Sequence, residues 1–142
     1  MKKITLFSDG SALGNPGPGG YGTILRFADK EREISGGEVH TTNNRMELLA
    51  VIEGLRALRE PCMVDIISDS SYVVKGINEW LESWIKRDFK KVKNPDLWIA
   101  YIEVSKGHKI NALWVRGHNG HVENERCDIL AKIAAQKMKE SM

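Results

Sequence analysis

Two aspartates occupy matching positions in the chain, each just beyond a short apolar run. Asp9 follows the run from Ile4 to Ser8, and Asp69 follows the run from Met63 to Ser68. If these runs are parallel neighbouring strands, both carboxylates lie near the carboxyl end of the sheet, where open α/β sheets place their ligands. A single aspartate at such a position more often begins a turn or caps a helix. The matched pair favours a shared site.

Two further acids, Glu47 and Asp128, fall in segments that are predicted to be helical. Taken alone, Glu47 is a glutamate that the helix dipole favours, and Asp128 is a solvated helical carboxylate. Together with the two aspartates they suggest a metal site, because carboxylate oxygens are the hard ligands that Mg²⁺ prefers. Such a set can hold two ions about 3.5–4 Å apart, one to activate water and one to stabilise a departing oxygen. This chemistry needs no nucleophilic triad, and no convincing triad is visible.

His118 follows an apolar strand and lies in a short segment flanked by Gly117 and Gly120. An imidazole in a glycine-flanked loop is suited to proton transfer near neutral pH. A solvent-exposed loop histidine without function is the equal alternative on the residues alone. His121 has weaker support and is expected to be structural.

The hydrophobic periodicity predicts the element order β–β–β–α–β–α–α–β–α. The expected strands are 4–8, 21–27, 31–39, 63–68 and 110–115, and the expected helices are 42–59, 71–84, 95–104 and 123–139. Segment 14–20 is rich in glycine and proline and predicts a loop. The first three strands suggest an antiparallel meander. The helix at 42–59 is then a crossover that makes strands 4–8 and 63–68 parallel, so the class is α/β with a mixed sheet.

The start of the first helix has several candidate caps. Any of the four residues from 41 to 44 could serve, and Asn44 with Glu47 has the spacing of a capping box. Within this helix, Leu48, Ile52 and Leu55 recur at i, i+4 and i+7 and predict one apolar stripe.

The composition is that of a globular protein with one domain, residues 1–142. The chain is 42% apolar and 28% charged, and it contains no linker-like stretch. Its 21 basic and 19 acidic residues give a net charge of +2, so any polyanion binding must come from local clustering. The chain has no apolar run of about 18 residues, and the apolar run after Lys3 is too short for a secretion signal. Cys62 and Cys127 form no CxxC pair, which argues against a zinc cluster and indicates a reducing cytoplasm.

A basic handle is predicted around residues 80–98. Segment 86–93 carries five positive charges and one negative charge, which gives +4 and leaves −2 for the rest of the chain. This concentration of charge is typical of a surface that binds a polyanion. A solvated charged face above buried aromatics is the alternative, and Trp84 and Trp98 fit such a packing role.

Six segments, taken in order, resemble bacterial type 1 ribonuclease H over nearly the whole chain. They are Asp9–Ser11, Gly14–Gly20, Thr41–Leu48, Ser68–Ser70, Gly117–His121 and Glu123–Asp128. The resemblance implies a ribonuclease H-like fold with a five-stranded mixed sheet flanked by helices. It also implies cleavage of the RNA strand of RNA–DNA hybrids, with Mg²⁺ as the cofactor and Mn²⁺ as a substitute.

The resemblance also assigns roles to individual residues. The metal-binding and catalytic carboxylates fall on Asp9, Glu47, Asp69 and Asp128, and His118 becomes the residue that assists water activation and product release. Three amides contact the minor groove of the hybrid, two residues hold a DNA-strand phosphate, and Trp80 lies against the DNA strand. The three amides are Asn15, Asn43 and Asn44. The two residues that hold the phosphate are Thr42 and Asn94.

The resemblance also implies that the handle supplies the remaining substrate contacts, through Lys86, Arg87, Lys90 and Lys91. A few other positions depart from the family pattern. Ser71 stands where glutamine is common in bacterial members, and His40 stands where arginine is common. The loop after Phe89 is shorter than in familiar members, which predicts a weaker hold on the substrate.

The sequence therefore predicts a monomeric, cytoplasmic, metal-dependent endoribonuclease that leaves 5′-phosphate and 3′-hydroxyl ends. Two alternatives remain. A non-catalytic hybrid-binding module would be expected to lack one or more of the four carboxylates. A DNA-acting nuclease of related fold would not need the Thr42–Asn44 segment or the basic handle.

Overall fold

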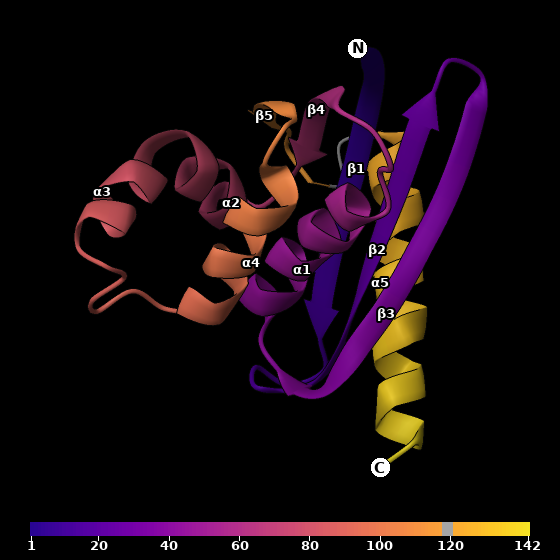
Figure 1. Cartoon of the computed structure of the whole chain (residues 1–142). Helices are drawn as coiled ribbons and strands as arrows, with labels where there is room; N and C mark the ends of the chain where they lie inside the picture. Colours follow the sequence, from indigo (N-terminus) through magenta and orange to yellow (C-terminus); the bar gives the residue numbers. More distant parts are fainter. Residues whose placement is uncertain (118–120) are drawn as a thin grey trace.

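The computed structural model describes residues 1–117 and 121–142. Its strands form one five-stranded sheet in the order β3-β2-β1-β4-β5 (Figure 1). Antiparallel pairing joins β1 to β2 and β2 to β3, and parallel pairing joins β1 to β4 and β4 to β5. The strands are β1 (Lys2–Ala12), β2 (Gly17–Phe27), β3 (Lys30–Thr41), β4 (Cys62–Ser68) and β5 (Lys109–Trp114).

Helices cover both faces of this sheet. The helix α1 packs on β1 and β2 and contacts α4, whereas α5 packs on β1, β2 and β3 from the opposite face (Figure 1). The α/β class and the parallel crossover between β1 and β4 are confirmed, and so is the predicted element order apart from the division of the helix at 71–84. The helical segments are α1 (Asn43–Arg56), α2 (Ser71–Lys75), the π-helical turn η1 (Gly76–Trp80), α3 (Leu81–Lys86), α4 (Pro95–Ser105) and α5 (Val122–Glu140).

The predicted apolar stripe of α1 forms the centre of the main core. Leu48, Ile52 and Leu55 are buried against Leu6 of β1 and Ile66 of β4 in a single cluster. Burial of each such aliphatic side chain contributes about 1.5–3 kcal/mol. This stripe therefore fixes the height and rotation of α1 over the two strands that carry Asp9 and Asp69.

The capping box predicted between Asn44 and Glu47 is wrong. Thr42 is the N-cap of α1, and its hydroxyl accepts a hydrogen bond from the backbone N–H of Arg45 at 3.2 Å. With the cap two residues earlier, Glu47 lies inside the helix, and its side chain is free to turn towards β1.

The loop predicted at 14–20 is shorter than expected, because β2 already begins at Gly17. The glycines of β2 stand where α5 approaches the sheet most closely. A Cβ at Gly20 would lie 2.4 Å from the carbonyl oxygen of Ala131, and a Cβ at Gly22 would lie 2.5 Å from that of Cys127. Several glycines in this region thus serve helix–sheet packing rather than a turn.

The single helix predicted at 71–84 is divided into α2, η1 and α3 and ends at Lys86. The π-helical turn begins at Gly76, which packs directly on Trp98. A Cβ at Gly76 would lie 2.3 Å from the indole ring. Such widened turns are frequently found near functional sites, and this one ends at Trp80.

Among the described residues, no helix combines the length and the apolar composition that crossing a membrane requires. Both cysteines, Cys62 and Cys127, are buried free thiols.

Candidate active site

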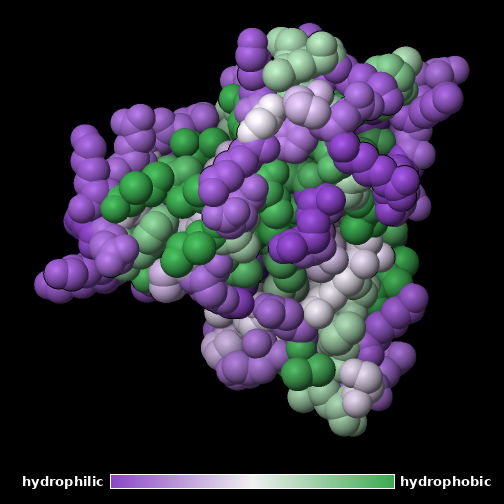
Figure 2. All heavy atoms as spheres, in the orientation of Figure 1, coloured by the Kyte–Doolittle hydropathy of each residue, from purple (hydrophilic) through white to green (hydrophobic). Residues whose placement is uncertain are grey.

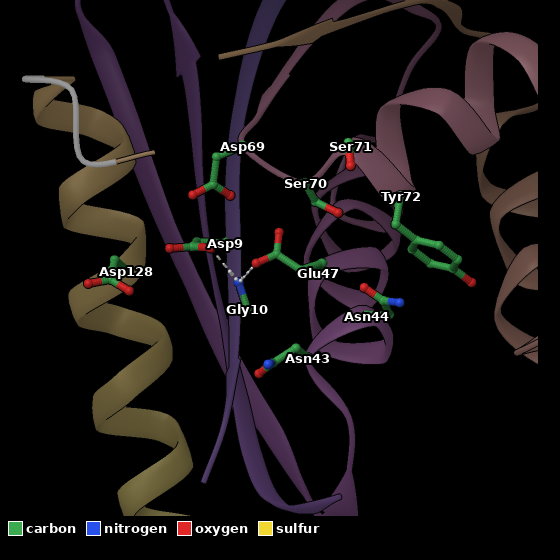
Figure 3. A pocket seen from close by; sticks show the side chains of 10 residues that line it. All are labelled: Asp9, Gly10, Asn43, Asn44, Glu47, Asp69, Ser70, Ser71, Tyr72 and Asp128. Atoms are coloured by element: carbon green, nitrogen blue, oxygen red, sulfur yellow. Dashed lines mark hydrogen bonds between the residues drawn. The ribbon is translucent and has the colours of Figure 1, made fainter. Parts of the chain in front are cut away.

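Three carboxylates meet at the carboxyl end of the parallel strands. Ser8 of β1 pairs with Ser68 of β4 in the parallel ladder, so Asp9 and Asp69 are the next residue of each chain segment. The third carboxylate, Glu47, reaches the same point from α1 (Figure 3). One oxygen from each of the three side chains lies within 4.8 Å of the other two. The predicted convergence of Asp9, Glu47 and Asp69, called here the three-carboxylate cluster, is therefore present in the structure.

Gly10 allows α1 to come close enough to β1 for this cluster to form. Its backbone N–H donates to Glu47 Oε1 at 2.8 Å and to Asp9 Oδ1 at 2.9 Å (Figure 3). A Cβ at this position would lie 2.3 Å from the backbone nitrogen of Glu47. Because Gly10 has no side chain, the carboxylates of Asp9 and Glu47 can both accept a hydrogen bond from its backbone N–H.

The cluster is strongly desolvated. Asp9 is 5% exposed and Glu47 is 8% exposed. Burial raises the pKa of Asp9 to about 6, with a smaller upward contribution from the charge of Asp69. Burial also raises the pKa of Glu47 well above its ordinary value, and the neighbouring Asp9 and Asp69 add to this. Buried like charges of this kind favour either a bound proton or a bound cation.

The donor set fits a hard divalent cation. The three side chains supply only oxygen atoms, which Mg²⁺ prefers as ligands. Glu47 Oε2 is buried and has no hydrogen-bond partner among the described residues. A cation at the cluster would compensate this unpaired acceptor and the mutual repulsion of the carboxylates.

The cluster lies in an open cavity of about 420 Å³. Asp128 of α5 lines the opposite wall of this cavity (Figure 3). It is not part of the close group, and its Oδ2 atom pairs with Lys132 Nζ at 3.0 Å. The structure thus brings three of the four predicted carboxylates together and places the fourth across the cavity.

A second cavity, of about 470 Å³, gathers most of the predicted substrate-binding polar residues. It shares two amides, Asn43 and Asn44, with the first cavity. The two cavities are therefore contiguous around the beginning of α1. The residues that line the second cavity are Asn15, Thr42, Asn43, Asn44, Lys93 and Asn94.

Three residues that sequence reasoning did not single out, Arg45, Asp96 and Tyr72, form a hydrogen-bond network with Asn94 beside this second cavity. Arg45 donates two hydrogen bonds to Asp96, at 3.0 and 3.1 Å, and a further one to Asn94 Oδ1 at 3.3 Å. Asn94 Nδ2 in turn donates to the hydroxyl of Tyr72 at 3.2 Å. Arg45 lies within the Thr41–Leu48 segment, but no pattern in the sequence links it to an acid 51 residues away.

The basic handle projects from the body of the molecule at α3 and the turns that follow it (Figure 1). Trp98 is fully buried, and Trp84 packs edge-on against it with ring centroids 5.1 Å apart, which confirms the predicted packing role of both. Trp80 is 38% exposed beside Trp84.

The cations of the handle are available to a ligand. Lys86, Arg87, Lys90 and Lys91 are all exposed, and hydrophilic side chains edge this projection in Figure 2. In the described part of the chain, none of the four takes part in an ion pair. The backbone of this segment is unusual, because Lys91 has a left-handed conformation with φ of 61°.

The remaining candidates are three histidines and Ser71. His118 lies outside the described residues. His121 is exposed and is the N-cap residue of α5, and among the described residues its side chain makes no capping hydrogen bond. Ser71 is exposed and lines the first cavity, whereas His40 is exposed on β3.

Comparisons with known proteins agree with this geometry. A family model described as RNase H matches residues 1–136. The chain is 66% identical over 141 residues to "Ribonuclease H" of Sulfurovum sp., covering 99% of this chain and 96% of that protein. It is 62% identical over 137 residues to "Ribonuclease HI" of Helicobacter pylori, covering 96% of each.

Solved structures show the same fold. LC9-RNase H1, a type 1 RNase H with the type 2 active-site motif, superposes with a TM-score of 0.89 at 33% identity, covering 97% of this chain and 74% of that one. LC11-RNase H1 in complex with an RNA/DNA hybrid superposes with a TM-score of 0.69 at 24% identity, covering 94% and 97%. The family match, the identities and the oxygen-rich cluster lead to one conclusion: the chain belongs to the RNase H family of enzymes.

Proposed function

We propose that this enzyme hydrolyses the RNA strand of RNA–DNA hybrids with Mg²⁺ bound at Asp9, Glu47, Asp69 and Asp128. The observation that carries the proposal is the convergence of three carboxylates, two of them buried and that of Asp69 half-buried, within 4.8 Å of one another. When two ions are bound, they supply an activated water and stabilise the leaving 3′-oxygen, which gives 5′-phosphate and 3′-hydroxyl products. Mn²⁺ should substitute for Mg²⁺, since the same oxygen ligands suit both ions.

The two contiguous cavities suggest how a hybrid duplex would lie. Asn43 and Asn44 face both cavities, and their amides can donate to and accept from 2′-hydroxyls and base edges. The N-terminus of α1 favours a phosphate group, with Thr42 and Asn94 beside it. We assign the first cavity to the RNA strand and the second cavity to a phosphate of the DNA strand. LC11-RNase H1, which has the same fold, carries an RNA/DNA hybrid in its crystal structure.

A panel of labelled duplexes tests this function directly. RNA–DNA, RNA–RNA and DNA–DNA duplexes of one sequence are incubated with the enzyme in Mg²⁺ and in EDTA, beside the Asp9→Asn variant. We expect cleavage of the RNA strand of the hybrid alone, only with Mg²⁺ and only by the unmodified enzyme. Cleavage in EDTA would refute the metal site, and cleavage of the DNA duplex would indicate a DNA-acting nuclease.

The handle should contribute to binding through phosphate contacts, and therefore in a salt-dependent way. Replacing Lys90 and Lys91 by glutamine should weaken hybrid affinity and lower the slope of log affinity against log salt by roughly 2, at about 0.9 per lost phosphate contact. Anisotropy of a labelled hybrid in EDTA measures both quantities.

The matched control for the handle removes two exposed lysines from the last turn of α5. The double variant Lys137→Gln and Lys139→Gln changes the net charge equally, at a site distant from both cavities. We expect it to leave the salt slope unchanged. The handle would be excluded as the binding surface if the two double variants lowered hybrid affinity equally. It would also be excluded if the hybrid affinity of the unmodified protein did not change with salt.

His118→Ala should slow turnover while leaving hybrid affinity intact, because a proton-transfer residue acts after binding. General acid–base catalysis typically contributes 10²–10⁴-fold, so a loss of about 10²-fold in kcat is expected. Single-turnover kinetics and anisotropy measure the two effects separately, with His121→Ala as the control. Weakened binding at an unchanged kcat would instead make His118 a substrate contact.

A further inference from the structure

Trp114, the last residue of β5, makes an unexpected contact with the backbone of Asp69, a member of the three-carboxylate cluster. Its side chain is 53% exposed, which is unusual for an indole at a strand end. Even so, its Nε1–H donates a hydrogen bond to the backbone carbonyl of Asp69 at 3.0 Å. The bond therefore joins the end of β5 to the residue that follows β4.

Asp69 differs from the other members of the cluster in how its backbone is held. Asp9 lies within β1 and Glu47 lies within α1, so the ladder and helix hydrogen bonds fix both. Asp69 lies between the end of β4 at Ser68 and the start of α2 at Ser71. No regular hydrogen-bond pattern positions it, and a backbone position of this kind depends on specific side-chain contacts.

The segment 114–117 supplies those contacts on one side of Asp69. Val115 N–H donates to the carbonyl oxygen of Ser68 at 2.9 Å, directly before the aspartate. Gly117 lies against the carboxylate itself, since a Cβ there would be 2.7 Å from Asp69 Oδ2. Within this segment, the Trp114 indole is the side chain that bonds Asp69 itself.

We propose that Trp114 is a positioning residue for Asp69, and that its indole N–H sets the affinity of the three-carboxylate cluster for Mg²⁺. This inference rests on the proposed function, in which Asp69 is a metal ligand. Groups that orient a metal ligand typically change metal affinity or activity by 10–100-fold when they are removed. Because this bond is exposed to solvent, we expect an effect at the lower end of that range.

The competing role for Trp114 is direct contact with substrate. It lines a third cavity of about 380 Å³ with Ser71, Val74, Lys75 and Glu79, and Ser71 also lines the first cavity. An exposed indole beside a nucleic-acid groove could pack against a nucleotide. Metal affinity measured in the free protein separates the two roles, because no substrate is then present.

The test uses Trp114→Phe, which keeps an aromatic ring and removes the donor. Mg²⁺ is titrated into ¹⁵N-labelled protein, and the amide resonance of Gly10 reports binding because this N–H donates to both Asp9 and Glu47. We expect the Mg²⁺ dissociation constant to rise roughly tenfold. Hybrid affinity in EDTA should stay the same, and kcat should recover largely at saturating Mg²⁺.

Two further proteins make the result decisive. Leu113→Ala alters the preceding residue of β5, which is 43% exposed, and should leave the Mg²⁺ affinity unchanged. Benzothienylalanine at position 114 keeps the shape of the indole without its N–H, and should reproduce the loss seen with Trp114→Phe. It also decides the matter if Trp114→Phe does not fold.

Three results would overturn the inference. They are an unchanged Mg²⁺ affinity in both donor-deficient proteins, an equal loss in Leu113→Ala, and a loss of hybrid affinity in EDTA with normal Mg²⁺ affinity. If the unmodified protein itself showed no Mg²⁺-dependent shift at Gly10, the proposed function would fail instead, so the two failures are distinguishable.

Discussion

Asp9→Asn is expected to abolish cleavage of the hybrid and, in the same protein, to raise thermal stability in EDTA. The asparagine keeps the shape of the side chain but removes one of the buried like charges that a metal would neutralise. The pKa of Asp9 is raised from 3.8 to about 6, and each unit corresponds to about 1.4 kcal/mol. A stabilisation of about 1–3 kcal/mol near neutral pH follows.

This stabilisation should depend on pH with a definite sign. Because the folded pKa of Asp9 lies above the unfolded value, the native state keeps its proton between about pH 4 and pH 6, whereas the unfolded state loses it. The stability of the unmodified protein therefore falls as pH rises through this window, and that of Asp9→Asn falls less. Thermal unfolding in EDTA should show a large difference at about pH 7.5 and a small one at about pH 4.

Asp29→Asn is the matched control, because Asp29 is exposed and distant from the cluster. It should change neither activity nor melting temperature. A lower melting temperature for Asp9→Asn together with retained cleavage would contradict both parts of the expectation. In Mg²⁺ the difference in melting temperature between Asp9→Asn and the unmodified protein should become smaller or change sign. The reason is that a ligand that binds only the native state stabilises it.

Gly10→Ala should be damaging to both the fold and the site. The new Cβ would lie 2.3 Å from the backbone nitrogen of Glu47 and 2.5 Å from the carbonyl carbon of Met46. Since both neighbours are backbone atoms, no side-chain rotation relieves the overlap, and α1 must move away from β1. Overpacking of this kind typically costs about 1–3 kcal/mol, occasionally more. The displacement also separates Glu47 from Asp9, so cleavage should be lost.

Urea unfolding and cleavage of a labelled hybrid measure the two effects of Gly10→Ala. Thr5→Ala, a small change in the same strand away from the cluster, should retain activity and most of the stability. Normal stability and normal cleavage in Gly10→Ala would show that α1 can adjust without disturbing the carboxylates. The close approach at Gly10 would then have no functional consequence.

The sequence predicts the part of the site that depends on strand order. Asp9 and Asp69 each follow an apolar run, and one helical crossover suffices to make those runs parallel neighbours. The position of Glu47 depends instead on how closely α1 approaches β1. That distance is set by the missing side chain at Gly10, and no periodicity reveals it.

Glycine is also the reason why the sequence predicts a longer loop at 14–20 than the structure contains. Gly20 lies in a strand and leaves room for α5 to pack closely on the sheet. The sequence alone does not distinguish such a glycine from one that forms a turn. Contacts between residues far apart in sequence are equally hidden. The bond from Trp114 to Asp69 and the pairing of Arg45 with Asp96 depend on the finished packing.

The left-handed backbone at Lys91 has an implication for engineering. A lysine with φ of 61° pays roughly 1–2 kcal/mol that a glycine would avoid. The substitution Lys91→Gly should consequently raise the melting temperature and lower the affinity for a polyanion. At this position thermal stability favours glycine and polyanion binding favours lysine, which is the residue present.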